Sequence, residues 1–206
     1  MNHGPASRND AAYLEDLWRG SFGEAYVDRN KLAGVSRAQF WSRVVDDLNP
    51  NSVLEIGTNV GGNLRHLVGR VQLTAGVDVN TTALTLLKER LPPVLVAEAT
   101  GRALPFPDES FDLVFTVGVL IHVPDDALGD ALDEMTRCSR RHVLVAEYHS
   151  DEEEVVPYRG QERALFKRDY AMRFLERYPK WGLIKSGHLS PDEGFDDVTY
   201  QIFARS

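Results

Sequence analysis

Two carboxylates beside a glycine turn are the residues whose types and spacing most directly indicate chemistry. The run VLEIGTNVGGNLRHL at 53–67 predicts a buried strand, a tight turn and the start of a helix. The run GVDVN at 76–80 predicts a second buried strand that ends in Asp78. This pattern is typical of the first βαβ unit of a nucleotide-type binding fold, in which the turn admits a ligand close to the backbone and the acid binds a ribose.

The spacing within the turn distinguishes between ligands. A dinucleotide-binding turn has the pattern G-x-G-x-x-G and directs helix amides at a pyrophosphate. Here Glu55 precedes Gly57 by two residues, the next glycines are Gly61 and Gly62, and Asn59 stands where a second glycine is usual. A carboxylate at this place would repel a pyrophosphate but suits a cation. The turn therefore favours S-adenosylmethionine, which carries a sulfonium and an ammonium and no phosphate.

In their order these elements resemble the motif series of class I S-adenosylmethionine-dependent methyltransferases. The resemblance rests on E-x-G-x-x-x-G at 55–61, on Asp78 and on LPFPDESFDLVFTVGVLIHVPDD at 104–126, and it covers roughly residues 51–148. A narrower resemblance, to methylases associated with pseudaminic acid biosynthesis, spans most of the chain. It rests on WRGSFGEAYVDRN at 18–30, GVLIHV at 118–123, RCSRRHVLVAEYH at 137–149 and VPYRGQERALFKRDYA at 156–171. The name of that family records the pathway in which its members are found more than the substrate that they methylate.

Composition narrows the class of protein. The 206 residues suffice for one α/β domain and are too few for two ordinary ones. The net charge of −8 disfavours a nucleic-acid partner, because such binding needs a basic surface. No apolar run approaches a membrane span, no secretory signal is visible, and the single cysteine, Cys138, fits a reducing compartment. We therefore expect a cytoplasmic protein that acts on a small molecule, with no membrane partner; the oligomeric state is left open.

The order of elements predicts an α/β fold with a parallel sheet, because strands and helices alternate after residue 51. The resemblance adds a single Rossmann-like methyltransferase domain, with a mostly parallel seven-stranded sheet, a C-terminal antiparallel strand and an N-terminal helical cap. We expect residues 1–50 to form this cap or lid and 51–206 the core. The expected strands are 53–56, 73–79, 94–97, 113–117, 142–147, 182–189 and 198–203. The expected helices are 11–19, 37–48, 62–68, 81–90, 126–138 and 166–177, with a loop or broken helix between the first two.

Ligands of open parallel sheets bind beyond the carboxyl ends of the strands, so the loops that follow the strands define the expected cofactor site. The expected cofactor-binding residues are Glu55, Gly57, Thr58, Asn59, Gly61, Asn63, Asp78, Val79, Thr100 and Val117. In the family the third loop often carries an acid that holds the adenine amino group. Thr100 takes that place here, with Glu98 two residues earlier, so the residue that contacts adenine is left open.

Three residues are the expected catalytic groups: Glu147, His122 and Tyr148. His122 follows the fourth strand and is either a general base or a residue that packs against the cofactor. In the run Glu147-Tyr148-His149 successive side chains face opposite ways, so about two of them reach the pocket. The expected substrate contacts are Tyr13, Tyr26, Arg29, Asn30, His149, Tyr158 and Arg159. Lys167 and Arg168 are expected on the solvated surface, and no metal-ligand spacing is present.

These residues lead to one main hypothesis and three alternatives. The main hypothesis is N-methylation of an amidino or guanidino group on a small molecule such as a sugar or secondary-metabolite intermediate. It combines the acid-and-tyrosine pocket with the amidino substituents that pseudaminic acid and related sugars carry. The closest alternative is O-methylation of a hydroxyl or carboxyl, with His122 as base. A non-catalytic cofactor-binding protein is a third possibility, and an NAD-dependent oxidoreductase is disfavoured by the turn.

Overall fold

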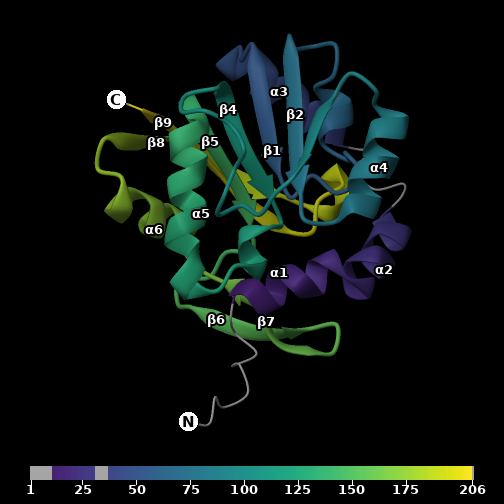
Figure 1. The fold of residues 1–206 in the computed structure, drawn as a ribbon. Coiled ribbons are helices and arrows are strands. Elements are labelled where there is room, and N and C mark those ends of the chain that lie inside the picture. The colour runs from purple at the N-terminus through teal and green to yellow at the C-terminus, as the bar shows by residue number, and fades with distance from the viewer. Residues whose placement is uncertain (1–10, 31–36, 206) are drawn as a thin grey trace.

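The fold is a seven-stranded sheet with helices on both faces (Figure 1), as seen in a computed structural model that describes residues 11–30 and 37–205. The strand order is β3-β2-β1-β4-β5-β9-β8. The first five strands are parallel, and β9 is antiparallel to both of its neighbours. The strands are β1 (Ser52–Ile56), β2 (Leu73–Asp78), β3 (Leu95–Glu98), β4 (Phe111–Val117), β5 (Ser139–Glu147), β8 (Trp181–Leu189) and β9 (Val198–Arg205). The predicted fold class is confirmed.

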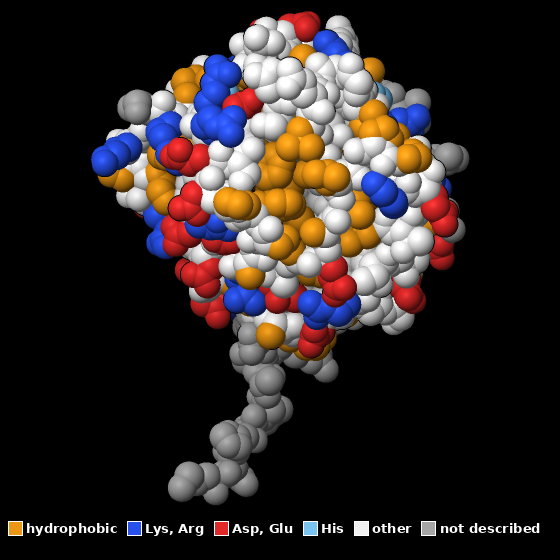
Figure 2. Space-filling view, turned by 45° about the horizontal axis from the view of Figure 1, so that its top comes forward, with side chains coloured by type: hydrophobic (Ala, Val, Ile, Leu, Met, Phe, Trp, Pro, Cys, Tyr) orange, Lys and Arg blue, Asp and Glu red, His pale blue; other side chains and the backbone are white. Residues whose placement is uncertain are grey.

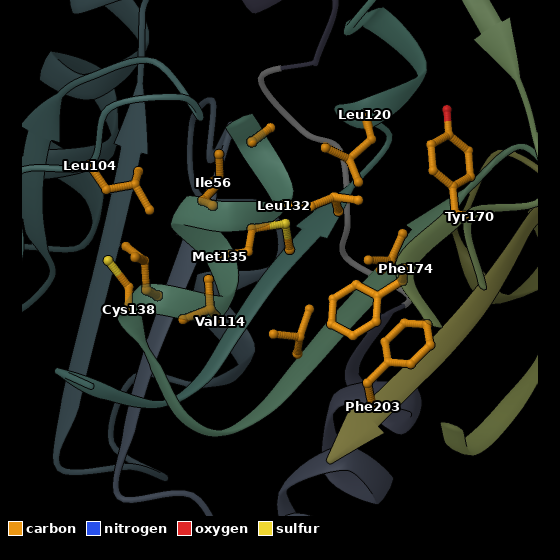
Figure 3. Packing of buried hydrophobic residues seen from close by; sticks show 14 of the residues in the cluster. Ile56, Leu104, Val114, Leu120, Leu132, Met135, Cys138, Tyr170, Phe174 and Phe203 are labelled. Atoms are coloured by element: carbon orange, nitrogen blue, oxygen red, sulfur yellow. The ribbon is translucent and has the colours of Figure 1, made fainter. Parts of the chain in front are cut away.

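Helices cover both faces of the sheet because its strands bury side chains on both sides. The helices are α1 (Ala11–Arg19), α2 (Ser21–Asn30), α3 (Ala38–Leu48), α4 (Thr81–Arg90), α5 (Asp125–Cys138) and α6 (Tyr170–Arg177); short 3-10 turns are η2 (Leu64–His66), η3 (Leu120–His122) and η4 (Pro191–Glu193). Along β4, Val114 packs in the core under α5 and α6, and Leu113 and Phe115 pack in the core under α3 and α4. Figure 3 shows the first of these cores, where Phe174 stacks on Phe203 with ring centroids 4.0 Å apart.

Two segments outside the main layers lie across the carboxyl ends of the strands (Figure 1): the α1–α2 pair and the hairpin of β6 (Glu154–Tyr158) and β7 (Gln161–Lys167). Leu14 of α1 packs against Ala164 and Phe166 of β7, and Val27 of α2 packs against Val60 and Ala83. These contacts join the N-terminal helices to the hairpin on one side and to the glycine turn and α4 on the other. The end of the sheet that is expected to bind ligands is thereby covered.

Some sequence-based expectations are wrong in detail. Residues 21–30 form a helix where a loop or broken helix was expected. Gly23 is needed there for packing, since a Cβ atom would lie 1.7 Å from the carbonyl oxygen of Trp18. The expected helix at 62–68 is only the 3-10 turn η2. The hairpin was not predicted, because its turn uses Arg159 (φ 48°) and Gly160 (φ 81°) in place of the usual Asn-Gly signal.

Candidate active site

A cavity of about 220 Å³ lies where the carboxyl ends of β1, β2 and β4 meet the α1–α2 pair. Most of the residues expected to bind cofactor line it, together with four of the expected catalytic and substrate residues. They are Glu55, Gly57, Asn59, Asn63, Asp78, Val79, Thr100, Val117, Tyr26, His122, Tyr148 and Tyr158. The expected site is therefore assembled at one place, although its segments span most of the chain.

The other expected residues do not line this cavity. Thr58, Gly61 and Glu147 lie behind its wall, and Tyr13, Arg29, His149 and Arg159 are exposed outside it. Tyr13 donates a hydrogen bond to Gln161 on the hairpin at 3.3 Å, and Nε2 of His149 lies 3.1 Å from Asp151. The side chain of Asn30 lies outside the described part of the chain. Contacts of these residues with a substrate stay a prediction.

The glycine turn brings the backbone close to the next loop. Gly57 has φ +69°, which a side chain would strain, and a Cβ atom there would lie 2.4 Å from Cγ2 of Val119. Its amide and that of Thr58 both donate to the carbonyl oxygen of Val77, at 2.8 and 3.0 Å. The turn is thus fixed between β2 and the loop after β4, with its inner side on the cavity.

Glu55 is a buried carboxyl group at the base of the turn, with 2% of its surface exposed. Its oxygens accept hydrogen bonds from the Thr58 hydroxyl at 3.0 Å and from Nδ2 of Asn63 at 2.6 Å. The side chain of Asn63 in turn accepts from Nη1 of Arg37 at 2.9 Å and from Nε1 of Trp41 at 3.2 Å. Burial raises the pKa of Glu55 to about 8. A cationic ligand group beside it would restore the charged form.

Asp78, at the end of β2, has its carboxylate oxygens held by backbone amides. Asn59 donates to Oδ2 at 2.8 Å and Asn80 donates to Oδ1 at 2.9 Å, while burial raises the pKa of this carboxyl above its usual range. Each carboxylate oxygen can accept a second donor, so two hydroxyl groups can still be bound. Oδ1 of Asn59 is buried and has no hydrogen-bond partner in the structure, which leaves another acceptor for a ligand. These donors and acceptors fit a cationic ligand that carries vicinal hydroxyls.

In the loop that follows β3, Thr100 faces the cavity, whereas Glu98, the last residue of β3, does not. Thr100 lines the cavity, and its hydroxyl accepts from the amide of Arg102 at 3.3 Å. Glu98 is exposed and lies 3.7 Å from Arg19, outside the cavity. Arg102 also forms a two-point ion pair with Glu15 of α1, at 2.9 and 3.0 Å, which joins this loop to the N-terminal helices.

His122 is a neutral, fixed imidazole in the roof of the cavity. Its Nδ1 lies 2.6 Å from the carbonyl oxygen of Ala164, so Nδ1 carries the hydrogen and Nε2 keeps the lone pair. Burial lowers the pKa of His122 to about 4. The ring packs against those of Trp18 and Tyr158, with centroids 4.7 and 4.8 Å away. The ring therefore packs against other side chains and keeps a weakly basic nitrogen, and its role as a base or as a contact of the cofactor stays a prediction.

Glu147 lies behind the roof rather than in the cavity wall. Its Oε1 accepts from the amide of Val119 at 3.1 Å and its Oε2 from the amide of Ile121 at 3.2 Å, and only 1% of the residue is exposed. Burial raises the pKa of this carboxyl to about 7. The next residue, Tyr148, faces the cavity instead, and burial raises the pKa of its hydroxyl to about 12. Glu147 therefore holds the loop that carries His122, and because Glu147 does not line the cavity, a base role would require its side chain to turn towards it.

The cavity residues that sequence reasoning did not single out include Trp18, Arg37 and Asp196. Trp18 was included only as the first residue of the run at 18–30 on which the narrower family resemblance rests. Arg37 precedes α3, where it stacks on Phe195 at 4.5 Å and donates to the carbonyl of Gly194 at 2.7 Å. No local signal marks Asp196, which reaches the cavity from the connection between β8 and β9.

The expectation of a solvated Arg168 is wrong. Its side chain is 1% exposed, because Nη1 donates to the carbonyl of Val123 and Nε donates to Glu153, both at 2.9 Å. Arg168 thus holds the end of the hairpin against the loop after β4.

Across residues 11–30 and 37–205, no group of three or more His, Cys, Asp and Glu side chains is arranged so that it could hold a metal ion.

Comparison with known proteins agrees with this geometry. Residues 53–142 match the profile of a family described as "Methyltransferase domain". Over these residues the chain is similar to that family. No curated protein matches the chain. The matched span holds the glycine turn, Asp78, Thr100 and His122, so the cavity is built mainly on this span.

Solved structures share the fold at low sequence identity. Burkholderia thailandensis 1,6-didemethyltoxoflavin-N1-methyltransferase, with bound 1,6-didemethyltoxoflavin and S-adenosylhomocysteine, has a TM-score of 0.75 at 17% identity. The match covers 100% of this chain and 93% of that one. Synechocystis PCC 6803 magnesium protoporphyrin IX methyltransferase, with bound S-adenosylhomocysteine, has a TM-score of 0.74 at 16% identity, covering 96% and 100%. The [4+2]-cyclase SpnF has a TM-score of 0.60 at 16% identity, covering 82% and 81%. At 16–17% sequence identity, these similarities show that the proteins share a fold.

Two further observations bear on partners. On the face shown in Figure 2, acidic and basic side chains lie next to one another around a central group of hydrophobic side chains. That face offers no uniformly basic surface of the kind that binds a polyanion. None of the helices within the described residues is long and apolar enough to span a membrane.

Proposed function

We propose that this protein is an S-adenosylmethionine-dependent methyltransferase that acts on a small molecule. The observation that carries the proposal is the pair of carboxyl groups, buried Glu55 and part-buried Asp78, on either side of a glycine turn within the span that matches the methyltransferase family. The cofactor supplies a methyl group on a sulfonium: the acceptor's lone pair forms the new bond to carbon as the carbon–sulfur bond breaks, and a thioether leaves.

The chain's own residues have distinct tasks in this proposal. Glu55, held by Asn63, receives the ammonium of the cofactor, and Asp78 receives its ribose hydroxyls. Thr100 lies beside the adenine. Residues 1–50 act as a lid that excludes water and 51–206 as the core that aligns the reactants. The contacts of α1 with both β7 and Arg102 support the lid role.

We place the protein in the cytoplasm. Its single cysteine is buried and has no partner for a disulfide within the chain, which fits a reducing compartment.

The acceptor in this proposal is a nitrogen atom of an amidino or guanidino group. Two features favour nitrogen over a hydroxyl. The pKa of His122, about 4, makes it a poor base for a hydroxyl, which must lose its proton as the new bond forms. An amidino or guanidino group instead gives up its proton to solvent before the reaction, and its neutral form then has a lone pair that needs no base. Tyr26, Tyr148 and Tyr158 line the cavity and can bind flat nitrogen groups by contacts with their rings and hydroxyls. Methylation of a hydroxyl, or of a carboxyl, which needs no base, is the alternative.

A labelling experiment tests the function directly. Such a test is needed because a [4+2]-cyclase has the same fold, so the fold alone does not establish methyl transfer. The purified protein is incubated with methyl-deuterated S-adenosylmethionine and sugars that carry amidino or hydroxyl groups, and the products are analysed by mass spectrometry. We expect a mass gain of one deuterated methyl on an amidino acceptor and formation of S-adenosylhomocysteine. Transfer to hydroxyls only would favour the O-methylation alternative. Failure of S-adenosylhomocysteine to bind in calorimetry would contradict the proposed function itself.

A further inference from the structure

Four aromatic side chains from separate segments form the roof of the cavity: Trp18 of α1, Tyr26 of α2, His122 of η3 and Tyr158 of β6. We call them the aromatic roof. Trp18 is at its centre, with ring centroids 4.7 Å from His122, 5.2 Å from Tyr26 and 6.4 Å from Tyr158. Each of the four is part-exposed, so their ring surfaces are available inside the cavity.

Hydrogen bonds hold the rings of His122 and Tyr158 in place. His122 is fixed through Nδ1 to the carbonyl of Ala164, and the Tyr158 hydroxyl accepts from Nε of Arg159 at 3.2 Å. Trp18 has a hydrogen bond at its backbone, where its carbonyl accepts from Nδ2 of Asn80 at 3.1 Å, while its indole is held by contacts with neighbouring rings. A rotation of the indole about its side-chain bonds would leave the backbone contact intact, and His122 and Tyr158 would keep their hydrogen bonds.

The space in the cavity requires such movement. Its volume of about 220 Å³ is below the usual range for ligand sites, roughly 300–1,000 Å³. Ring centroids 4.7 Å apart mean that Trp18 already touches His122, and another ring fits between two rings only when they separate to roughly 7 Å. Cofactor and acceptor together thus need Trp18 to withdraw from His122 and Tyr158.

The charges around the roof favour recognition by shape. Asp196 lines the cavity on this side, and it interacts electrostatically with both Arg37 and Arg159. This group of three has no excess of negative charge that would select a cation. The ring surfaces, together with the lone pair on Nε2 of His122, are what remain to select an acceptor.

We propose that the acceptor presents a flat, π-conjugated nitrogen group, which lies between the indole of Trp18 and the wall formed by His122 and Tyr158. This inference rests on the proposed function and deepens it by naming the substrate class. Contact with the indole on one face and with the Tyr158 ring, which is inclined to the indole by 34°, on the other face fixes the plane of the group, and an N–H at its edge can donate to Nε2 of His122. Amidines conjugated to a ring and nitrogen heteroaromatics both belong to this class.

Calorimetric binding of small probes to the full-length protein, saturated with S-adenosylhomocysteine, tests the proposal. The probes are benzamidine, the neutral benzamide and cyclohexanecarboxamidine, which has the same charge as benzamidine but a saturated ring. We expect benzamidine and benzamide to bind within a few-fold of each other and the cyclohexyl compound about tenfold more weakly. Equal binding of the two amidines, or no binding of benzamidine at about 10 mM, overturns the proposal.

Substitution of the roof gives a second test. Trp18→Leu should weaken benzamidine binding about tenfold while Trp18→Phe restores most of it, because the inference concerns an aromatic surface. Phe22→Leu is the matched control, since Phe22 packs 5.2 Å from Trp18 but does not line the cavity. Affinity for S-adenosylhomocysteine is measured in each variant. If it is retained and Trp18→Leu binds benzamidine normally, the stacking proposal fails while the proposed function stands.

Discussion

The carboxylate of Glu147 accepts a hydrogen bond from the backbone amide of Val119, at 3.1 Å, and so connects the end of β5 to the loop after β4. Val119 packs against the turn at Gly57, and the same loop carries His122. A second hydrogen bond, from the amide of Ile121, fixes the other carboxylate oxygen. One buried acid thus controls the position of the loop next to which methyl transfer is proposed to occur.

The first prediction is that Glu147→Gln destabilises the protein as well as slowing turnover. The amide of glutamine can accept from one of the two backbone donors but presents its own N–H₂ to the other. A buried donor left without a partner costs about 1–3 kcal/mol, which should appear in the free energy of unfolding from urea titration. Lower turnover by 10²–10⁴ with unchanged stability would instead support the general-base role.

The second prediction concerns Asp78. Asp78→Ala removes the proposed acceptors for two ribose hydroxyls and should weaken binding of S-adenosylhomocysteine by about 1.5–3 kcal/mol in calorimetry. Asp192→Ala serves as the control, because Asp192 is an exposed acid in η4, away from the cavity. Unchanged affinity in the Asp78 variant would exclude the ribose role.

The third prediction is that cofactor affinity rises with pH up to about 8. Burial raises the pKa of Glu55 to about 8, so this group is protonated in the free protein near pH 7. A ligand ammonium favours the carboxylate and lowers that pKa, so binding releases a proton below pH 8 and releases none above it. The dissociation constant should therefore fall by up to tenfold per pH unit from 6 to 8.

Calorimetry in buffers of different ionisation enthalpy measures this proton release. Glu55→Gln should abolish it and flatten the pH profile, because glutamine does not titrate in this range. Proton release that persists in this variant would assign the effect to another group, with Asp78 the first candidate because burial also raises its pKa.

The parts of the site that sequence predicts are those fixed by local spacing. Glu55 and Asp78 end neighbouring strands beside one turn, so their approach follows from the βαβ pattern. Arg37 and Asp196 reach the cavity through packing between distant segments, which no local pattern records. Glu147 shows the other limit: a strand end can be located from sequence, but which of two adjacent side chains faces the cavity depends on the loop beside it.

The fourth prediction tests the lid. Deleting the first thirty residues removes Leu14 and Val27 from their contacts with Ala164 and Val60. Because the two main cores lie within the remaining chain, we expect a folded protein by circular dichroism that lacks turnover. Full activity of this truncated protein would exclude a lid role for the α1–α2 pair.

The last prediction distinguishes nitrogen from hydroxyl acceptors through His122. Asparagine at this position can still donate to the carbonyl of Ala164 but lacks the lone pair of Nε2. With a pKa of about 4, the imidazole is neutral at pH 7 and weakly basic, so it orients an acceptor more readily than it removes a proton. His122→Asn should therefore lower turnover of a nitrogen acceptor by less than about tenfold, whereas a hydroxyl acceptor that depends on this base should lose about 10²–10⁴. Urea titration shows whether the variant keeps its stability. A stable but inactive His122→Asn protein, beside a fully active Glu147→Gln protein, would contradict the amidine proposal and favour O-methylation.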